Sequence, residues 1–418
     1  MDKSRKRLFS NTVYLYIMQL ATQILNLVTI PYLTRVLGPT VYGKIGLAVG
    51  YMTYVTLILD FGFLLSATQE VSEHKEDKAY ISGIFTSVLI VKLVLAFIIA
   101  AVFVIFGKTG VINEKDIPFY IIYLIAYVVN ALLPDFFYRG VEDMKIISVR
   151  TVVIKAVFAG LIFVLVKGQS DYFFVPISLL AGNIIAVLVS YFDVYKRYRI
   201  TFKSVSSRVT LSLVRKSTPF FVSRFSATFY QALNVIILGR VYGDSPVVGY
   251  YTSSDKFITL VKTGSSPIAD SLYPYMLNNR DFRLIKKIFK ITVPAILLCA
   301  VFAWTFSEQI CVIAFGAEYR DAGNILRCLL PIAVVILPSY ILAFPVLSPM
   351  GLAKYANMSN IIGMCIQLVG LLALSHFKSV NVYNLCILTS ITEVSVFLFR
   401  LIIVLVNKDR LKKTNDTQ

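Results

Sequence analysis

The chain is poor in the residues on which soluble enzymes rely. Only 15% of its 418 residues are charged, it has two histidines and one tryptophan, and 57% of its residues are hydrophobic. Soluble domains carry about 25% charged and 45–50% apolar residues, so a soluble protein of this size could not cover so much apolar surface. The composition therefore predicts a membrane protein, with lipid as its solvent.

The cysteines and histidines show no metal-binding spacing. The five cysteines lie in or beside apolar segments, without a CxxC motif: Cys299, Cys311, Cys328, Cys365 and Cys386. We interpret them as small apolar residues of helices. The two histidines, His74 and His376, cannot make a metal site by themselves. We expect neither a metal nor a cofactor.

Sequence motifs of common enzyme classes are missing as well. The chain has no GxSxG, P-loop or HExxH motif and no dinucleotide fingerprint after a strand. The longest loop expected outside the membrane, 308–324, is too short for a separate catalytic domain. We therefore expect no enzymatic activity and assign no catalytic residue.

What the sequence has instead is a series of about twelve apolar runs, each of roughly twenty residues. They lie near 11–33, 45–66, 81–106, 117–138, 150–167, 172–193, 216–239, 249–273, 288–307, 325–348, 356–376 and 381–406. Each run is long enough to cross a hydrocarbon core of about 30 Å as a helix. The first is longer than the apolar part of a signal peptide and no A-x-A site follows it, so it is predicted to remain uncleaved. The pattern predicts an all-α polytopic membrane protein.

Positive charge dominates and is unevenly shared between the loops. The chain has 41 Lys and Arg against 23 Asp and Glu, a net charge of +18. Most of the bases fall in the N-terminal segment, alternate loops and the C-terminal tail, which a twelve-helix map places on one side. Because basic loops stay in the cytoplasm, both termini are predicted to be cytoplasmic. Bases clustered between apolar runs argue against nucleic-acid binding.

The most basic loop, 194–215, divides the predicted helices into two sets of six. We expect an N-terminal lobe at 1–193, this loop as a cytoplasmic linker, and a C-terminal lobe with a short tail at 216–418. Because six crossings is an even number, both lobes would insert the same way up. That predicts a pseudo-two-fold axis along the membrane normal.

A short internal repeat supports this duplication. Arg35-Val-Leu-Gly38 and Val41-Tyr-Gly43 follow the first predicted helix. Arg240-Val-Tyr-Gly243 and Val247-Val-Gly-Tyr250 follow the seventh. Both sets lie at the outer end of the first helix of a half, which is where a duplicated lobe would place them.

Ionisable residues inside the predicted helices are the main functional signal, because they are costly in lipid and usually face a cavity or a partner. Lys92, Arg224 and Lys262 lie too deep to reach a membrane surface easily. Lys155 and Arg400 lie closer to helix ends, and we expect them to extend to the surface. Bases outnumber acids at depth, which predicts a cationic cavity suited to phosphate oxygens.

Acids accompany these bases, and either of two roles fits them. Glu393 is central in the last predicted helix, whereas Asp60 and Asp270 lie toward the cytoplasmic ends of theirs. They either couple transport or form structural pairs with buried bases, as Asp270 could with Arg224. The candidate substrate-binding residues are Arg224, Lys262, Lys92 and Arg35, and the candidate coupling or structural acids are Asp60, Glu393 and Asp270.

Several motifs, taken in order, resemble one family. In the first half they are Asn11-Thr-Val-Tyr-Leu-Tyr16, Pro31-Tyr-Leu-Thr-Arg-Val-Leu-Gly38, Tyr42-Gly43 and Asp60-Phe-Gly-Phe63. In the second half they are Pro219-Phe-Phe-Val-Ser-Arg224, Ile237-Leu-Gly239 and Val248-Gly-Tyr-Tyr251. Their joint order and spacing resemble the bacterial O-antigen (Wzx-type) translocases, which are flippases of polysaccharide repeat units.

The resemblance implies the multidrug/oligosaccharidyl-lipid/polysaccharide exporter fold, with two six-helix lobes around a central cavity. It implies an undecaprenyl-pyrophosphate-linked repeat unit as substrate, moved by alternating access from the cytoplasmic to the periplasmic leaflet of the inner membrane. Basic cavity residues are typical of the family, and Arg224 is the match here. Membrane lipid, a polysaccharide polymerase and a chain-length regulator are the implied partners.

Two other functions compete with this one. A drug or cation antiporter on the same fold predicts an acidic cavity, and the excess of buried bases argues against it. A membrane polymerase or ligase acting on the same glycolipids predicts a long periplasmic loop, which the sequence lacks.

Overall fold

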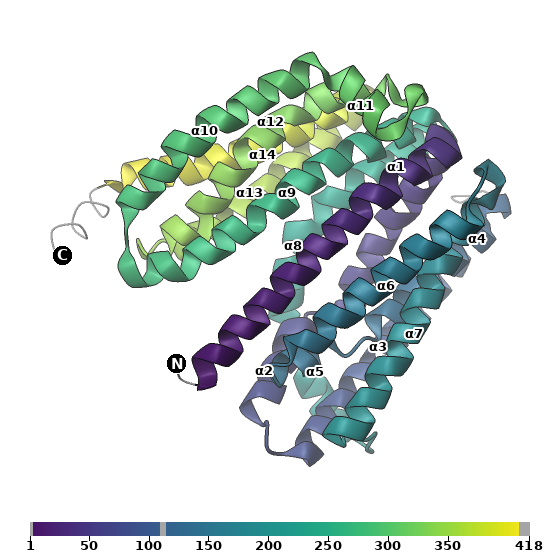
Figure 1. The fold of residues 1–418 in the computed structure, drawn as a ribbon, viewed down its shortest axis with the longest axis vertical. Coiled ribbons are helices and arrows are strands. Elements are labelled where there is room, and N and C mark those ends of the chain that lie inside the picture. The colour runs from purple at the N-terminus through teal and green to yellow at the C-terminus, as the bar shows by residue number, and fades with distance from the viewer. Residues whose placement is uncertain (1–2, 109–113, 409–418) are drawn as a thin grey trace. The chain divides into compact units, whose positions relative to one another are not determined.

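The computed structural model describes residues 3–108 and 114–408, and over those residues it contains helices and no strand (Figure 1). The long and short α-helices are α1 (Lys3–Asp60), α2 (Phe63–Glu73), α3 (Lys78–Lys108), α4 (Ile117–Ala131), α5 (Asp135–Gly140), α6 (Met144–Leu165), α7 (Phe174–Tyr198), α8 (Ser207–Tyr242), α9 (Pro246–Asn279), α10 (Phe282–Thr305), α11 (Ser307–Phe315), α12 (Ala322–Ile341), α13 (Ala353–His376) and α14 (Val382–Val406). Short turns η1 (Glu114–Asp116), η2 (Gln169–Phe173), η3 (Ala317–Tyr319) and η4 (Leu342–Val346) connect some of them. The all-α prediction is confirmed.

The chain folds into two compact units. Unit 1 comprises Met1–Leu37 and Ala48–Phe225, and unit 2 comprises Gly38–Leu47 and Ser226–Gln418. A short piece of α1 thus packs with the C-terminal helices, and the first part of α8 packs with the N-terminal ones. The lobe boundaries predicted around the loop 194–215 stay a prediction.

Nine stretches of the described residues are long and apolar enough to cross a membrane. The first, Val13–Glu73, has 61 residues and is kinked at Gly38, and since about 20 helical residues span the hydrocarbon core, it suffices for two crossings. Helices α8 and α9 have 36 and 34 residues but are more polar than the nine. With these two included, the helices account for the twelve crossings predicted from the sequence.

The order of elements repeats along the chain. In each half the first two long helices meet at an Arg-Val-x-Gly turn, between the two parts of α1 and between α8 and α9. Both glycines have a positive φ, 69° at Gly38 and 57° at Gly243. Glycine adopts this backbone without the strain that a Cβ brings, so the repeated glycine marks the same turn in both halves.

The fourth long helix is broken in each half. Helix α4 ends just before Pro134, and α5 starts after it. Helix α12 runs into the π-turn η4, which contains Pro345 and the non-helical residue Ala343. Proline removes a backbone donor and clashes with the preceding turn, which explains both breaks. Two unbroken helices then complete each half, α6 and α7 in the first and α13 and α14 in the second.

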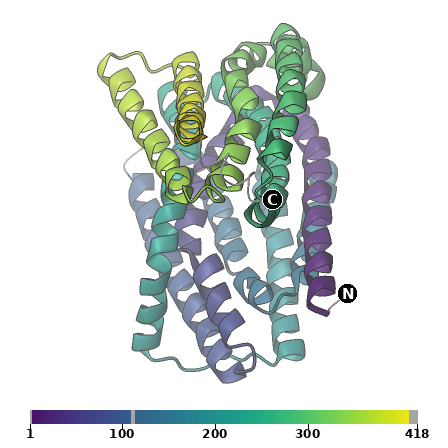
Figure 2. The ribbon, with the colours of Figure 1, turned by 90° about the vertical axis from the view of Figure 1, so that its left-hand side faces the viewer.

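Helix α12 is central in unit 2, and α10 is peripheral. Helix α12 packs against α9, α14, α10 and α11, and it lies between α10 and α14 in Figure 1. In the most apolar part of α12, 67% of the residues are buried, whereas no residue in the most apolar part of α10 is buried. The same helices can be followed from the side in Figure 2.

Two predicted boundaries differ in the structure. The predicted second helix, 45–66, is interrupted: α1 ends at Asp60, and α2 restarts at Phe63 and continues to Glu73. The predicted outer loop 308–324 is largely helical, because α11 and η3 occupy its first part. Short apolar segments near helix ends carry too little periodicity to reveal such breaks and restarts.

Candidate functional site

Asp60 and Arg224 form an ion pair within unit 1. Asp60 is the last residue of α1, and Arg224 lies midway along α8, where its Nη1 donates to Oδ2 of Asp60. The aspartate side chain is 20% exposed and the arginine side chain 49% exposed. Arg224 therefore keeps part of its planar set of donors accessible while its charge is balanced on one side.

The break after Asp60 positions this pair. Gly62 has a φ of 78°, and a Cβ at Gly62 would lie 2.7 Å from the carbonyl oxygen of Ser217 in α8. The rings of Phe61 and Phe221 stack with their centroids 4.8 Å apart. The motif Asp60-Phe-Gly-Phe63 therefore brings the end of α1 against α8, so that the carboxylate of Asp60 reaches Arg224.

Lys92 is buried in unit 1 and is held by a helix end. It is 7% exposed, and its Nζ donates to the carbonyl oxygen of Ala131, 2.5 Å away, in the last turn of α4. The negative charges of Asp60 and Asp135 also act on it. Because α4 is broken here, its last carbonyls lack partners within the helix, and a cation at that end is favourable.

Asp135 and Arg150 extend this group of charges, and sequence reasoning missed both. Arg150 Nη2 donates to Asp135, and its Nη1 donates to Ser190 Oγ at 3.1 Å. Arg150 is only the first residue of the predicted run 150–167, but in the structure it lies inside α6 and is 7% exposed. Arg224, Asp60, Lys92, Asp135 and Arg150, hereafter the unit 1 charge group, comprise three cations and two anions.

In unit 2, Lys262 and Glu393 form an ion pair between two helices. Lys262 Nζ, from α9, donates to Glu393 Oε1, from α14, at 2.9 Å. Their side chains are 22% and 8% exposed. Both residues were predicted from their depth in the membrane, and the structure brings them together.

Arg400 does not extend to the membrane surface, and that expectation was wrong. It is 6% exposed, and its guanidinium donates to Ser359 Oγ at 2.8 Å and to both the carbonyl oxygen and the Oγ of Ser339. Nη2 also donates to Asn360 Oδ1 at 2.8 Å. Serine residues on the neighbouring helices thus accept the hydrogen bonds that Arg400 would otherwise make to water at the membrane surface.

The remaining candidates lie on exposed surfaces of their own helices. Asp270 is exposed and accepts from Ser266 Oγ at 3.0 Å. Asp270 was considered as a possible structural partner of Arg224, but the ion pair that Arg224 forms is with Asp60. The break at Gly62 places Asp60 beside α8. Arg35 is exposed on α1, three residues before the kink at Gly38.

An uncharged polar network joins four helices of unit 2. Asn234 Nδ2 donates to Thr389 Oγ1 at 2.6 Å, and Gln367 Nε2 donates to Asn234 Oδ1 at 3.1 Å. Thr392 donates to Gln367 Oε1 at 2.8 Å, and Tyr251 accepts from Asn234 at 3.3 Å. Buried polar groups that satisfy one another specify a single packing. A search for charges in the sequence could not find this network.

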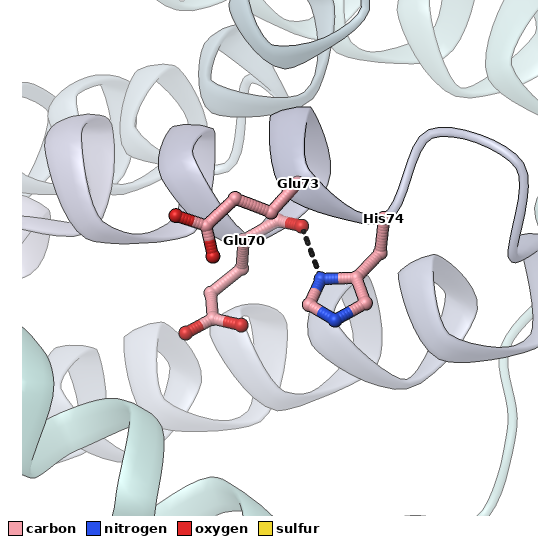
Figure 3. A group of neighbouring side chains, drawn as sticks. All are labelled: Glu70, Glu73 and His74. Carbon is pink, nitrogen blue, oxygen red and sulfur yellow. Dashed lines mark hydrogen bonds between the residues drawn. The ribbon is translucent and has the colours of Figure 1, made fainter.

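Three side chains of α2 and its C-terminal end lie close enough together to hold a metal ion, Glu70, Glu73 and His74 (Figure 3). Their oxygens are already engaged, however. Glu70 accepts from Lys216 at 2.5 Å and from Tyr80 at 2.7 Å. His74 Nδ1 lies 3.0 Å from the Glu70 carbonyl oxygen, the contact dashed in Figure 3. We assign this group to the anchoring of α2 and not to metal binding.

The comparisons with known proteins decide the family. The sequence model of the family described as "Polysaccharide biosynthesis protein" matches residues 8–280. The chain belongs to this family. Two curated relatives bear the name "Putative O-antigen transporter". The one from Shigella dysenteriae is 25% identical over 94% of this chain and 98% of its own length. The one from Escherichia coli (strain K12) is 26% identical over 80% of this chain and 82% of its own.

Solved structures show the same fold. A multidrug resistance MATE family transporter of the MOP superfamily, in an inward-facing conformation, matches with a TM-score of 0.68 at 17% identity, over 98% of this chain and 99% of that one. The lipid II flippase MurJ, in its inward closed conformation, matches with a TM-score of 0.66 at 13% identity, over 95% and 87%. The resemblance to O-antigen translocases and the multidrug-exporter-like fold inferred from the sequence are confirmed.

Proposed function

We propose that the protein flips an undecaprenyl-pyrophosphate-linked oligosaccharide repeat unit from the cytoplasmic to the periplasmic leaflet of the inner membrane. The product would serve the synthesis of O-antigen or a related surface polysaccharide. Membership of the polysaccharide biosynthesis family and the names of the two relatives support the substrate class. The fold shared with a lipid II flippase supports the movement of a lipid-linked sugar.

The observation that carries the mechanism is the half-exposed guanidinium of Arg224 beside Asp60. A guanidinium stays charged at any cellular pH and offers donors in a fork that matches phosphate oxygens. Asp60 balances part of that charge, and the pyrophosphate of the substrate would bind the donors that Asp60 leaves accessible. One charge-assisted contact of this kind contributes about 1.5–3 kcal/mol, or roughly ten- to a hundred-fold in affinity.

The other candidate basic residues are proposed to play different roles in substrate binding. Arg35 is exposed on its helix and is proposed as a further contact for the anionic substrate. Lys262 is partly exposed but balanced by Glu393, and Lys92 is held by the end of α4. We propose that Lys92 adds to the positive potential of a cationic cavity through which alternating access carries the headgroup, whereas Lys262 mainly pairs with Glu393.

We propose the inner membrane as the location, with both termini in the cytoplasm. The polymerase and the chain-length regulator of the same pathway are the proposed protein partners, because they would act on the product. Flipping a lipid-linked sugar does not require the chain itself to be an enzyme, and both relatives bear the name of a transporter.

The test is deletion of the gene in its native host, followed by analysis of surface polysaccharide and of lipid-linked intermediates. The proposal predicts loss of the polymer and accumulation of its lipid-linked unit on the cytoplasmic side, both restored by the intact gene. Unchanged polymer in the deletion strain would contradict it.

One observation favours a second function, a drug or cation antiporter. The match to the MATE transporter is as good in fold as the match to the flippase. The cationic excess of the unit 1 charge group argues against a cationic substrate. Measuring drug susceptibility in the same deletion strain separates the two, because only the antiporter predicts hypersensitivity with normal polysaccharide.

A further inference from the structure

Helix α10 has two dissimilar sides. Phe282 and Ile285, in its first turn, are buried in the core of unit 2 together with Leu337 of α12 and Met276 of α9. The opposite side is apolar and exposed along the rest of the helix, at Ile291, Leu297, Leu298, Val301 and Phe302. In a membrane protein such a surface faces the acyl chains of lipids, since no soluble protein could leave it bare.

The first two turns of α10 carry a stripe of four exposed bases. Arg283, Lys286, Lys287 and Lys290 are all exposed, and their spacing of three and four residues places them on one side of the helix. The side is the lipid-facing one, because Lys287 is followed at helical spacing by Ile291 and then by Leu298 and Val301. The stripe therefore continues the apolar surface directly to the end of the helix.

These four bases have no ion-pair or hydrogen-bond partner among residues 3–108 and 114–408. The nearest acid in sequence, Asp281, is already used as the helix cap. Its Oδ1 accepts from the Leu284 backbone amide at 3.0 Å, and its Oδ2 accepts from the Tyr275 hydroxyl at 3.4 Å. Four like charges side by side repel one another, so an external anion would stabilise them.

We propose that this stripe, Arg283, Lys286, Lys287 and Lys290, binds the phosphate headgroups of anionic phospholipids. The apolar surface below it fixes its depth, since a helix side that meets acyl chains meets headgroups one or two turns further on. Lys and Arg stems lie along apolar surface while their charged ends reach the phosphates, and basic clusters next to a membrane helix attract anionic lipid. Anionic lipid would thereby hold the peripheral helix α10 against α12.

The chain offers a matched control. Lys203, Arg208 and Arg215 are also exposed bases on the side predicted to be cytoplasmic. They lie in the irregular segment before α8 and in its first turns. Among the side chains of α8 that the structure describes, no run of exposed apolar residues as long as that of α10 leads up to them. If charge alone attracted lipid, both sets of bases would count equally.

The experiment uses the purified full chain reconstituted in bilayers that contain trace spin-labelled phosphatidylglycerol or phosphatidylcholine. Electron paramagnetic resonance gives the motionally restricted fraction of each lipid. The wild-type chain should restrict phosphatidylglycerol more than phosphatidylcholine. The triple variant Lys286→Gln, Lys287→Gln, Lys290→Gln should lose this preference, and the control variant Lys203→Gln, Arg208→Gln, Arg215→Gln should keep it.

Equal loss in both variants, or retention in both, would overturn the proposal. If the triple variant fails to fold, the same lysines changed to arginine must keep the preference, and high salt must reduce it in the wild-type chain. Undecaprenyl pyrophosphate added as a competitor should leave the restricted phosphatidylglycerol unchanged. Displacement would instead assign the stripe to the transported substrate.

Discussion

Gly43 and Gly249 touch each other through their backbones in unit 2, and they occupy equivalent positions of the sequence repeat. A Cβ at Gly43 would lie 2.8 Å from the Gly249 nitrogen, and one at Gly249 would lie 1.9 Å from the Pro39 carbonyl oxygen. Contact between equivalent residues is what a two-fold relation between the two repeated turns produces. Only glycine allows two backbones to approach so closely.

Replacing Gly249 by alanine should therefore destabilise the protein, because the added methyl group meets a carbonyl group of the backbone that cannot rotate away. We expect a lower melting temperature in detergent and a lower abundance in the membrane. Gly160→Ala is the control, since a Cβ there meets nothing within 4 Å, and alanine raises helix propensity. Equal melting temperatures of the two variants would show that the repeated turns do not pack as described.

The Lys262–Glu393 pair should behave as a buried unit. Removing one partner leaves the other charge unpaired in a low dielectric, at a cost of about 3–5 kcal/mol. Lys262→Met should thus reduce the free energy of unfolding strongly, whereas Lys262→Met combined with Glu393→Leu should recover most of the loss. A double-mutant cycle on thermal or denaturant unfolding measures this coupling. Purely additive effects would mean that the two side chains do not interact.

The short helix α11, which connects α10 to α12, contains a pH-dependent contact. Hydrogen bonding from Arg320, and the nearby charges of Arg320 and Arg327, lower the pKa of Glu308 below its ordinary 4.5. A lowered pKa stabilises the folded state above that ordinary value, and the gain disappears as the pH falls through the lowered pKa. Glu308→Gln should therefore melt earlier than the wild type at neutral pH. The difference should vanish once the pH has fallen below the lowered pKa of Glu308, and a difference that persists under those acidic conditions would contradict the assignment.

The distribution of bases predicts the topology. Reporter fusions after Lys203 and Arg283 should read cytoplasmic, and fusions after Glu114 and Tyr319 should read periplasmic. All four positions lie among the described residues, in or beside the connections between long helices. A periplasmic signal at Lys203 would overturn the twelve-helix map and the parallel orientation of the halves.

The sequence predicted the helices well because lipid imposes long apolar runs, and it predicted the repeat because glycine is needed at Gly38 and Gly243. Depth in the membrane also singled out Lys262 and Glu393, but as separate candidates and not as a pair. Which charged side chains pair with one another depends on how the helices pack, and the hydrophobic periodicity of the sequence does not reveal that packing. Arg224 meets Asp60 only because the chain breaks at Gly62.

Two buried arginines were not predicted because short polar side chains, distant in the sequence, accept their hydrogen bonds. Arg400 stays inside because Ser339 and Ser359 accept its hydrogen bonds, and serines are too common in helices to signal this. Arg150 looked like a loop residue because it stands near the start of an apolar run, yet Asp135 and Ser190 hold it inside unit 1. Such contacts join residues far apart in sequence and become visible only in the fold.

Arg224 is proposed to bind the pyrophosphate of the substrate, and the competing explanation is that it forms a purely structural ion pair with Asp60. Arg224→Lys tests the geometry, because it keeps the charge and loses the bidentate fork. We expect it to restore surface polysaccharide only in part. Arg224→Ala combined with Asp60→Asn removes both charges and separates the two accounts, since it should restore export only if the pair is structural.

The most direct measurement is the amount of surface polysaccharide made by the deletion strain when it carries the Arg224→Ala variant, compared with the intact gene at equal protein level. We predict that export is abolished or strongly reduced while the abundance of the variant stays normal, and that adding Asp60→Asn does not restore it. Normal export by a stably expressed Arg224→Ala variant would show that Arg224 does not bind the pyrophosphate.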